Sequence, residues 1–121
     1  MFLYLASPYS HKDKKVVLER FEQTEEALAK LLRRGMTVYS PIVHCHALAT
    51  KFGLPTDAEY WQRYNHRFLS VCRKLLVLQI DGWSTSLGVN DEIRYADIHH
   101  KPIVYLNPAS IDSHTLEDYL A

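Results

Sequence analysis

An almost uninterrupted apolar segment at residues 74–80 constrains the fold of this chain more than any other feature. Its sequence, Lys-Leu-Leu-Val-Leu-Gln-Ile, shows no alternation of apolar and polar positions. Such a strand is typical of a parallel sheet with both faces covered by helices, since a half-exposed strand alternates. The segment is also far shorter than the roughly twenty apolar residues of a membrane span. We therefore predict an α/β fold with residues 74–80 as its central strand.

Helical patterns alternate with short apolar segments along the rest of the chain. Further strands are predicted at residues 2–6, 36–39 and 102–106, and helices at residues 10–34, 41–52, 56–71, 88–99 and 111–120. Strands that alternate with helices indicate a parallel sheet with crossover connections. We predict a single domain, residues 1–121, built as a three-layer sandwich with a four- to five-stranded parallel sheet in flavodoxin-like or Rossmann-like order.

Two capping boxes predict where helices begin. Ser10 is followed by Asp13, and Thr56 by Glu59, with the spacing in which the two side chains satisfy each other's backbone N–H groups. We expect Ser10 and Thr56 to be the N-cap residues. For Ser10, a place in the loop after the first strand is an equal alternative.

Composition excludes several classes of function. The chain has 14 basic and 14 acidic residues, and this balance argues against binding a nucleic-acid polymer, which needs a clustered excess of Lys and Arg. Cys45 and Cys72 are too few for a disulfide framework. The first residues lack the basic and long apolar regions of a signal peptide. We expect a cytoplasmic domain that binds neither nucleic-acid polymers nor membranes. A small nucleotide remains a candidate ligand, because one phosphate needs only a local site.

The stretch from Asp81 to Glu92 points to catalysis. Asp81 leaves the buried strand, a small polar turn with Ser86 and Gly88 follows, and Glu92 lies in the first turns of a helix. Ligands of open α/β sheets bind where strands end, and a helix N-terminus keeps a nearby carboxylate ionised. Two carboxylates at one edge are what glycosyl transfer needs. The alternative is that both simply interact with the helix dipole and the turn.

Other motifs narrow the chemistry. The loop after the first strand, with Ser7 and Tyr9, lacks the spaced glycines of a dinucleotide-binding site, and no Walker-type phosphate loop occurs. His44 and His46 would lie about 200° apart on a helix, so we expect no metal site and keep a catalytic or substrate-binding role open for His44. Trp61 could stack on a base, but helical spacing favours packing in the core.

Residues 86–92, Ser-Leu-Gly-Val-Asn-Asp-Glu, together with residues 4–8, Tyr-Leu-Ala-Ser-Pro, resemble a known family. They are similar to the nucleophile segment and the first strand of nucleoside 2-deoxyribosyltransferases. The likeness is closer to their relatives, the 2′-deoxynucleoside 5′-monophosphate N-hydrolases. The resemblance spans roughly residues 1–97 in the order of elements, although only these two motifs are specific.

The resemblance implies a set of roles. Glu92 would be the nucleophile that attacks the anomeric carbon and displaces the base, and Ser86, with Gly88 beside it, would hold a phosphate. Ser7 and Tyr9 would lie in the other substrate-binding loop. The family usually has an acidic residue where this chain has Asn65. No cofactor is implied, and the family often completes its site across a subunit interface, which implies a homo-oligomer.

Protonation of the leaving base needs a neighbouring group, for which Asp81 and His44 are the candidates. We predict an enzyme that cleaves or transfers at the N-glycosidic bond of a nucleoside or nucleotide. Two alternatives are an N-glycosidase for NAD or an ADP-ribose compound, and a nucleotide-binding module that has lost turnover.

Overall fold

The computed structural model describes residues 1–112 and confirms the predicted α/β sandwich. Four parallel strands form one sheet in the order β2-β1-β3-β4. The strands are β1 (Phe2–Ala6), β2 (Thr37–Tyr39), β3 (Lys74–Leu78) and β4 (Ile103–Leu106). This is the order of the first four strands of a flavodoxin-like sheet. Both β1 and β3 are central strands, in agreement with the apolar sequence of residues 74–80.

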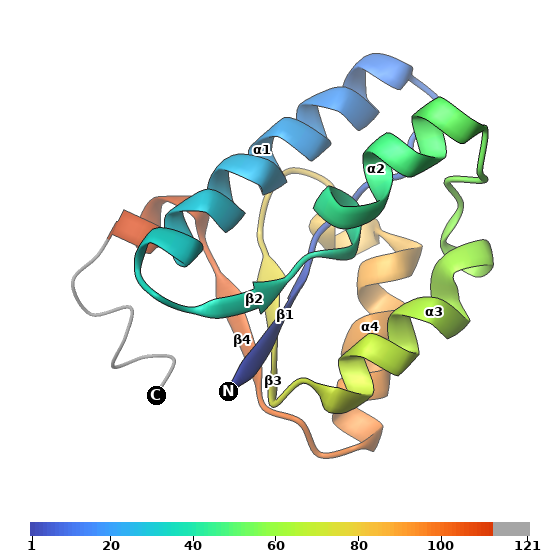
Figure 1. The fold of residues 1–121 in the computed structure, drawn as a ribbon. Coiled ribbons are helices and arrows are strands. Elements are labelled where there is room, and N and C mark those ends of the chain that lie inside the picture. The colour runs from blue at the N-terminus through green and yellow to red at the C-terminus, as the bar shows by residue number, and fades with distance from the viewer. Residues whose placement is uncertain (113–121) are drawn as a thin grey trace.

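Helices cover both faces of the sheet (Figure 1). They are α1 (Lys14–Arg33), α2 (Pro41–Phe52), α3 (Ala58–Val71) and α4 (Leu87–Ile98), with short 3₁₀ helices η1 (Trp83–Thr85) and η2 (Pro108–Asp112). One face packs against α1 and η2, and the other against α3 and α4. Helix α2 packs against α1, toward the end at which β1 leaves the sheet (Figure 1).

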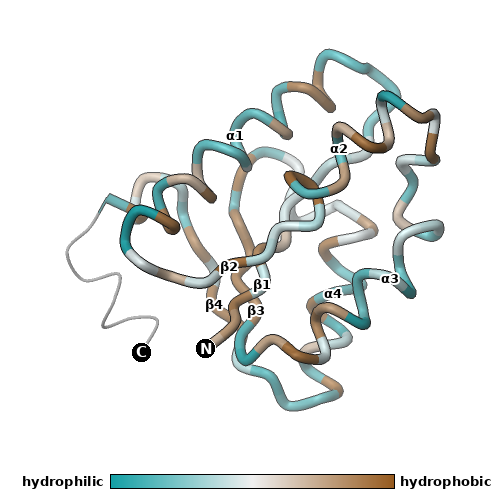
Figure 2. The backbone as a smooth tube through the Cα atoms, viewed as in Figure 1, coloured by the Kyte–Doolittle hydropathy of each residue, from teal (hydrophilic) through white to brown (hydrophobic). Residues whose placement is uncertain are grey.

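Successive residues of β1 point to opposite faces of the sheet, so β1 contributes to the core on both faces. Leu3 and Leu5 pack with Leu31 of α1, whereas Tyr4 and Ala6 pack on the side of α3 and α4. This alternation follows from the two-residue period of a strand. Figure 2 shows the apolar residues concentrated on the strands, with hydrophilic residues along the outer side of α1.

The helix starts differ from the predicted capping boxes. Helix α1 is capped by Asp13, whose Oδ1 accepts from the backbone N–H of Lys15 at 2.9 Å. Helix α3 is capped by Asp57, whose Oδ2 accepts from Tyr60 N–H at 3.0 Å. An aspartate carboxylate is a strong N-cap acceptor, so both helices start later than the hydroxyl residues suggested. Ser10, which was predicted to be the N-cap, instead contacts the loop before α3.

The C-terminal part of the chain is only partly described. The helix predicted at residues 111–120 lies outside the described residues except for its first two positions, which belong to η2. Among residues 1–112, no helix is long and apolar enough to cross a membrane.

Candidate functional site

A cavity opens at the carboxyl ends of β1 and β3, next to the point where the strand order reverses. Its volume is about 360 Å³, within the usual range for small-molecule sites. The walls come from the loop after β1, from α1, α2 and the start of α3, and from the turn that leads into α4. Segments far apart in sequence thus meet where α/β sheets bind ligands.

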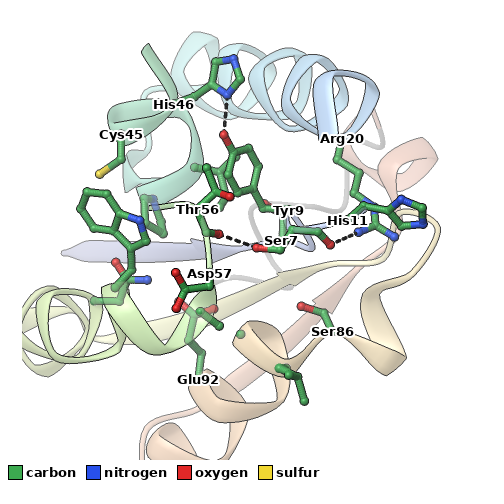
Figure 3. Close-up of a pocket in the computed structure, with 18 of the residues that line it drawn as sticks. Ser7, Tyr9, His11, Arg20, Cys45, His46, Thr56, Asp57, Ser86 and Glu92 are labelled. Carbon is green, nitrogen blue, oxygen red and sulfur yellow. Dashed lines mark hydrogen bonds between the residues drawn. The ribbon is translucent and has the colours of Figure 1, made fainter. Parts of the chain in front are cut away.

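Glu92 forms part of the cavity wall and is only 5 % exposed. It extends from the second turn of α4 toward the cavity (Figure 3). Burial raises the pKa of its carboxyl to about 8. The Tyr4 hydroxyl opposes this shift and lowers the pKa, whereas the charge of Asp91 adds to it. With this pKa the Glu92 carboxyl is mostly protonated at neutral pH.

This result corrects the expectation that the start of the helix keeps Glu92 ionised. Glu92 is the sixth residue of α4, beyond the first turn where unpaired N–H groups stabilise negative charge. Removal of the carboxyl from water then dominates, because desolvation disfavours the charged form.

Polar atoms without partners converge on the cavity. Ser7 Oγ, Asn65 Oδ1 and Glu92 Oε2 are buried, have no hydrogen-bond partner among residues 1–112, and belong to residues that line the cavity. The buried Tyr4 Oη also lacks a partner of standard hydrogen-bond geometry there. Since buried polar groups in proteins are nearly always paired, a hydroxyl, an amide and a carboxyl in this state indicate a polar ligand.

One end of the cavity favours negative charge. Ser86 is the N-cap of α4, and its Oγ accepts from Val89 N–H at 3.2 Å. The first turn of this helix, including Gly88, faces the cavity with backbone N–H groups that the helix itself does not satisfy. The Arg20 guanidinium also lines the cavity and donates from Nη1 to the Ser10 carbonyl at 2.9 Å.

Gly82 makes the position of Arg20 possible. Its φ of +92° lies in the left-handed region, and a Cβ at this position would come within 2.3 Å of Arg20 Nη2. A glycine is therefore favoured by the backbone conformation, and a Cβ would also displace the end of the Arg20 side chain.

The other part of the cavity is aromatic and apolar. Trp61 lines it together with Ile42 and Ala49 of α2. The Trp61 indole is fixed by a hydrogen bond from Nε1 to the Pro55 carbonyl at 2.7 Å. We predicted that Trp61 packs in the core, but it lines the cavity instead. An indole in this position offers a flat surface to a ring.

Tyr9 and His46 form a hydrogen-bonded pair in the cavity wall. Tyr9 Oη lies 2.6 Å from His46 Nδ1, and both residues line the cavity (Figure 3). The His46 ring stacks on Phe21 with centroids 3.9 Å apart, which holds its plane. Burial lowers the pKa of His46, although the charge of Glu25 opposes the shift.

The loop after β1 is tied to the loop before α3. The Ser10 hydroxyl donates to the Thr56 carbonyl, so the two residues that were predicted to be caps join the two loops instead. Both residues line the cavity.

Six of the eight predicted site residues line this cavity. They are Ser7, Tyr9, Asn65, Ser86, Gly88 and Glu92. Asp81 and His44 are exposed and do not line it. Asp81 lies one residue before the turn at Gly82, and the His44 ring lies beside Tyr39 of β2, with ring centroids 5.6 Å apart. Asp81 thus follows the carboxyl end of β3, at the predicted edge of the sheet, but outside the cavity that Glu92 lines.

Sequence reasoning missed Arg20 and the site role of His46. Arg20 lies in a long charged helix and carries no local signal of function. For His46 the sequence did hold a signal: His44 and His46 are about 200° apart around a helix, so only one of them can face the site. Among residues 1–112, no cluster of His, Cys, Asp and Glu is suited to hold a metal ion.

The fold and the cavity together define an α/β sandwich domain with a candidate small-molecule site at the switch point of its sheet. The chain belongs to the family described as domain of unknown function (DUF1937), which matches residues 1–107. No curated protein matches the chain.

Proposed function

We propose that this protein cleaves or transfers at the N-glycosidic bond of a nucleoside or nucleotide, with Glu92 as the nucleophile. The observation that carries the proposal is the convergence of the unpartnered Ser7 Oγ, Asn65 Oδ1 and Glu92 Oε2 on one cavity. The sequence resemblance of residues 4–8 and 86–92 to nucleoside 2-deoxyribosyltransferases and N-hydrolases adds support.

The cavity offers complementary surfaces for the parts of a nucleotide. Trp61 would stack on the base, and the Ser7 hydroxyl and the Asn65 amide would bind polar groups of the sugar or base. Ser86, the first turn of α4 and Arg20 would bind a phosphate. Glu92 would then lie beside the anomeric carbon.

The chemistry requires the ionised form of Glu92. Its carboxylate attacks the anomeric carbon while the bond to the base breaks, and the transition state carries positive charge on the sugar. That charge favours the carboxylate, so the raised pKa of the ligand-free enzyme falls as the reaction proceeds. Burial of Glu92 also makes the charge stabilisation larger than it would be in water.

A nucleotide-binding module without turnover is the second candidate. It is favoured by the protonated state of Glu92 and by Asn65, an amide where the resemblance implies an acid. Such a protein would bind the same ligands but would release no base.

The test is base release from a panel of ribonucleosides, deoxyribonucleosides, their monophosphates and NAD, followed by liquid chromatography. Glu92→Gln is compared with Glu22→Gln, which changes an exposed glutamate of α1 outside the cavity. We expect one class of nucleoside or nucleotide to lose its base, at a rate that Glu92→Gln lowers by at least about 10³-fold and Glu22→Gln leaves unchanged. Release of nicotinamide alone would instead support the NAD reaction.

Binding without release of any base would overturn the enzymatic proposal and support the binding module. Full activity of Glu92→Gln would overturn the assigned nucleophile. The homo-oligomer implied by the resemblance is tested separately by light scattering, where a monomeric mass would contradict it.

A further inference from the structure

The departing base needs a proton, and the residues first considered for this role lie outside the cavity. Asp81 and His44 do not line it. Of the other proton-bearing groups in the wall, Asp57 acts as a hydrogen-bond acceptor at the start of α3, and His11 accepts from Asp13 N–H on the exposed side of the loop. These contacts leave the Tyr9–His46 pair as the group best arranged to deliver a proton.

We propose that Tyr9 is the proton donor to the leaving base and that His46 is its positioning residue and proton source. This inference rests on the proposed N-glycosidic reaction. Tyr9 extends from the loop after β1, whereas Glu92 rises from α4 at the opposite wall of the cavity (Figure 3). A sugar beside Glu92 would direct its base toward the Tyr9 wall of the cavity, where the Tyr9 hydroxyl lies beside His46.

The hydrogen bond within the pair can run in either direction. When His46 is neutral, its Nδ1 accepts from the Tyr9 hydroxyl across the 2.6 Å contact. When His46 is protonated, Nδ1–H becomes the donor, and the Tyr9 hydroxyl is free to donate into the cavity. His46 is only partly buried, so it can exchange protons with water.

A Glu92 carboxylate oxygen forms a bond to the anomeric carbon, and the electron pair of the broken C–N bond goes to the base. The base takes the Tyr9 proton, Tyr9 takes the Nδ1 proton of the His46 imidazolium, and His46 is left neutral. In hydrolysis, water then attacks the glycosyl ester, Glu92 leaves as carboxylate, and the water proton returns through Tyr9 to His46.

Contacts around His46 explain why this histidine suits the role. Phe21 stacks on its ring, and the Tyr9 ring meets it edge-on with an interplanar angle of 89°. These neighbours leave Nδ1 directed at Tyr9. Burial lowers the pKa of His46, and the charge of Glu25, one turn after Phe21 on α1, opposes this shift with a smaller effect. The step therefore draws on the minor form in which His46 rather than Glu92 holds the proton.

The experiment compares two leaving bases on the same sugar. The first substrate is the nucleoside or nucleotide that the panel identifies, whose base needs a proton. The second has the same sugar and phosphorylation state but carries nicotinamide, which leaves as a neutral molecule and takes no proton. We measure kcat on both substrates for the single variants Tyr9→Phe, His46→Phe, His46→Gln and Glu92→Gln, and for the double variant of Tyr9→Phe with His46→Phe. The control is Tyr105→Phe, which lies outside the cavity.

We expect Tyr9→Phe to lower kcat on the first substrate by about 10²- to 10⁴-fold, the range typical of general acid catalysis, and on the nicotinamide substrate by less than about 10-fold. His46→Phe and His46→Gln should show the same selectivity. The double variant should be no slower than Tyr9→Phe alone, because the two residues act as one unit. Tyr105→Phe should match the wild type on both substrates.

Equal losses on both substrates, or no loss on either, would overturn the role of Tyr9. Additive losses in the double variant would overturn the role of His46. Failure of the underlying reaction gives a different pattern: the wild type releases neither base, or Glu92→Gln keeps full activity on both.

Discussion

The Tyr4 hydroxyl on β1 and the Glu92 carboxyl on α4 alter each other's pKa in opposite directions. Tyr4 lowers the pKa of Glu92, whereas burial and the Glu92 charge raise the pKa of Tyr4. Tyr4 is a buried core residue of the central strand β1, and Glu92 is the proposed nucleophile. The free energy of unfolding is therefore linked to the protonation state of Glu92, on which the proposed reaction depends.

Stability should fall as pH rises through the range in which only the folded state keeps the Glu92 proton. The pKa of Glu92 is raised from 4.5 to about 8, so the folded protein binds more protons than the unfolded chain between these values. By linkage, the free energy of unfolding decreases over this window, by about 3–5 kcal/mol. Urea unfolding from pH 5 to pH 9 measures the effect.

Glu92→Gln should remove most of this decrease, because the amide does not titrate. Glu22→Gln, at an exposed position, should keep the wild-type dependence. The raised pKa would be contradicted if the free energy of unfolding changed between pH 5 and pH 9 by the same amount in the wild type and in Glu92→Gln.

Tyr4→Phe should move the pH dependence of catalysis. The proposed step needs the Glu92 carboxylate and the His46 imidazolium together, so kcat/KM is expected to fall as pH rises through about 8, where these two groups lose their last proton. Loss of the Tyr4 hydroxyl removes an interaction that lowers the Glu92 pKa, so this alkaline limit should shift to higher pH. Tyr105→Phe serves as the control, and an unshifted profile in Tyr4→Phe would show that the hydroxyl does not act on Glu92.

Gly82→Ala should destabilise the protein more than Gly53→Ala. Both glycines have positive φ, at +92° and +67°, but only a Cβ at Gly82 meets the Arg20 guanidinium. Strain alone costs about 1 kcal/mol, and because the guanidinium ends a flexible side chain that can move aside, its displacement should add only about 0.5 kcal/mol. Chemical unfolding of the two variants gives the difference, and equal losses would contradict the close approach of Arg20.

Arg20→Gln should weaken binding of a nucleoside monophosphate without changing binding of the nucleoside. A hydrogen bond between charged groups contributes about 1.5–3 kcal/mol, so the Kd for the monophosphate should rise about 10- to 100-fold. Titration calorimetry with both ligands tests this, and Arg67→Gln on the exposed side of α3 is the matched control. The same loss for both ligands would place Arg20 away from the phosphate.

The fold was accessible from the sequence because its signals are local. The apolar run of β3 and the amphipathic pattern of α1 reveal strands and helices through their periods. The predicted capping boxes were wrong because Asp13 and Asp57 compete as acceptors within the same turns. Such competition is decided by backbone geometry that a spacing rule does not contain.

The candidate site was accessible only in part. Ser7 directly follows β1, Ser86 caps α4 and Glu92 lies in its second turn, and this context is visible in the sequence. Arg20 and His46 reach the cavity through tertiary packing of α1 and α2, which leaves no pattern nearby. The protonated state of Glu92 likewise depends on burial by several elements, which no local pattern in the sequence reveals.

Chemical rescue of Glu92→Ala tests the central claim most directly. This variant lacks the proposed nucleophile, so it should release base at least about 10³-fold more slowly than the wild type. Azide, small enough to enter the space left by the carboxylate, should restore base release and form a glycosyl azide with inverted anomeric configuration. Base release by Glu92→Ala at the wild-type rate without azide would show that Glu92 is not the nucleophile.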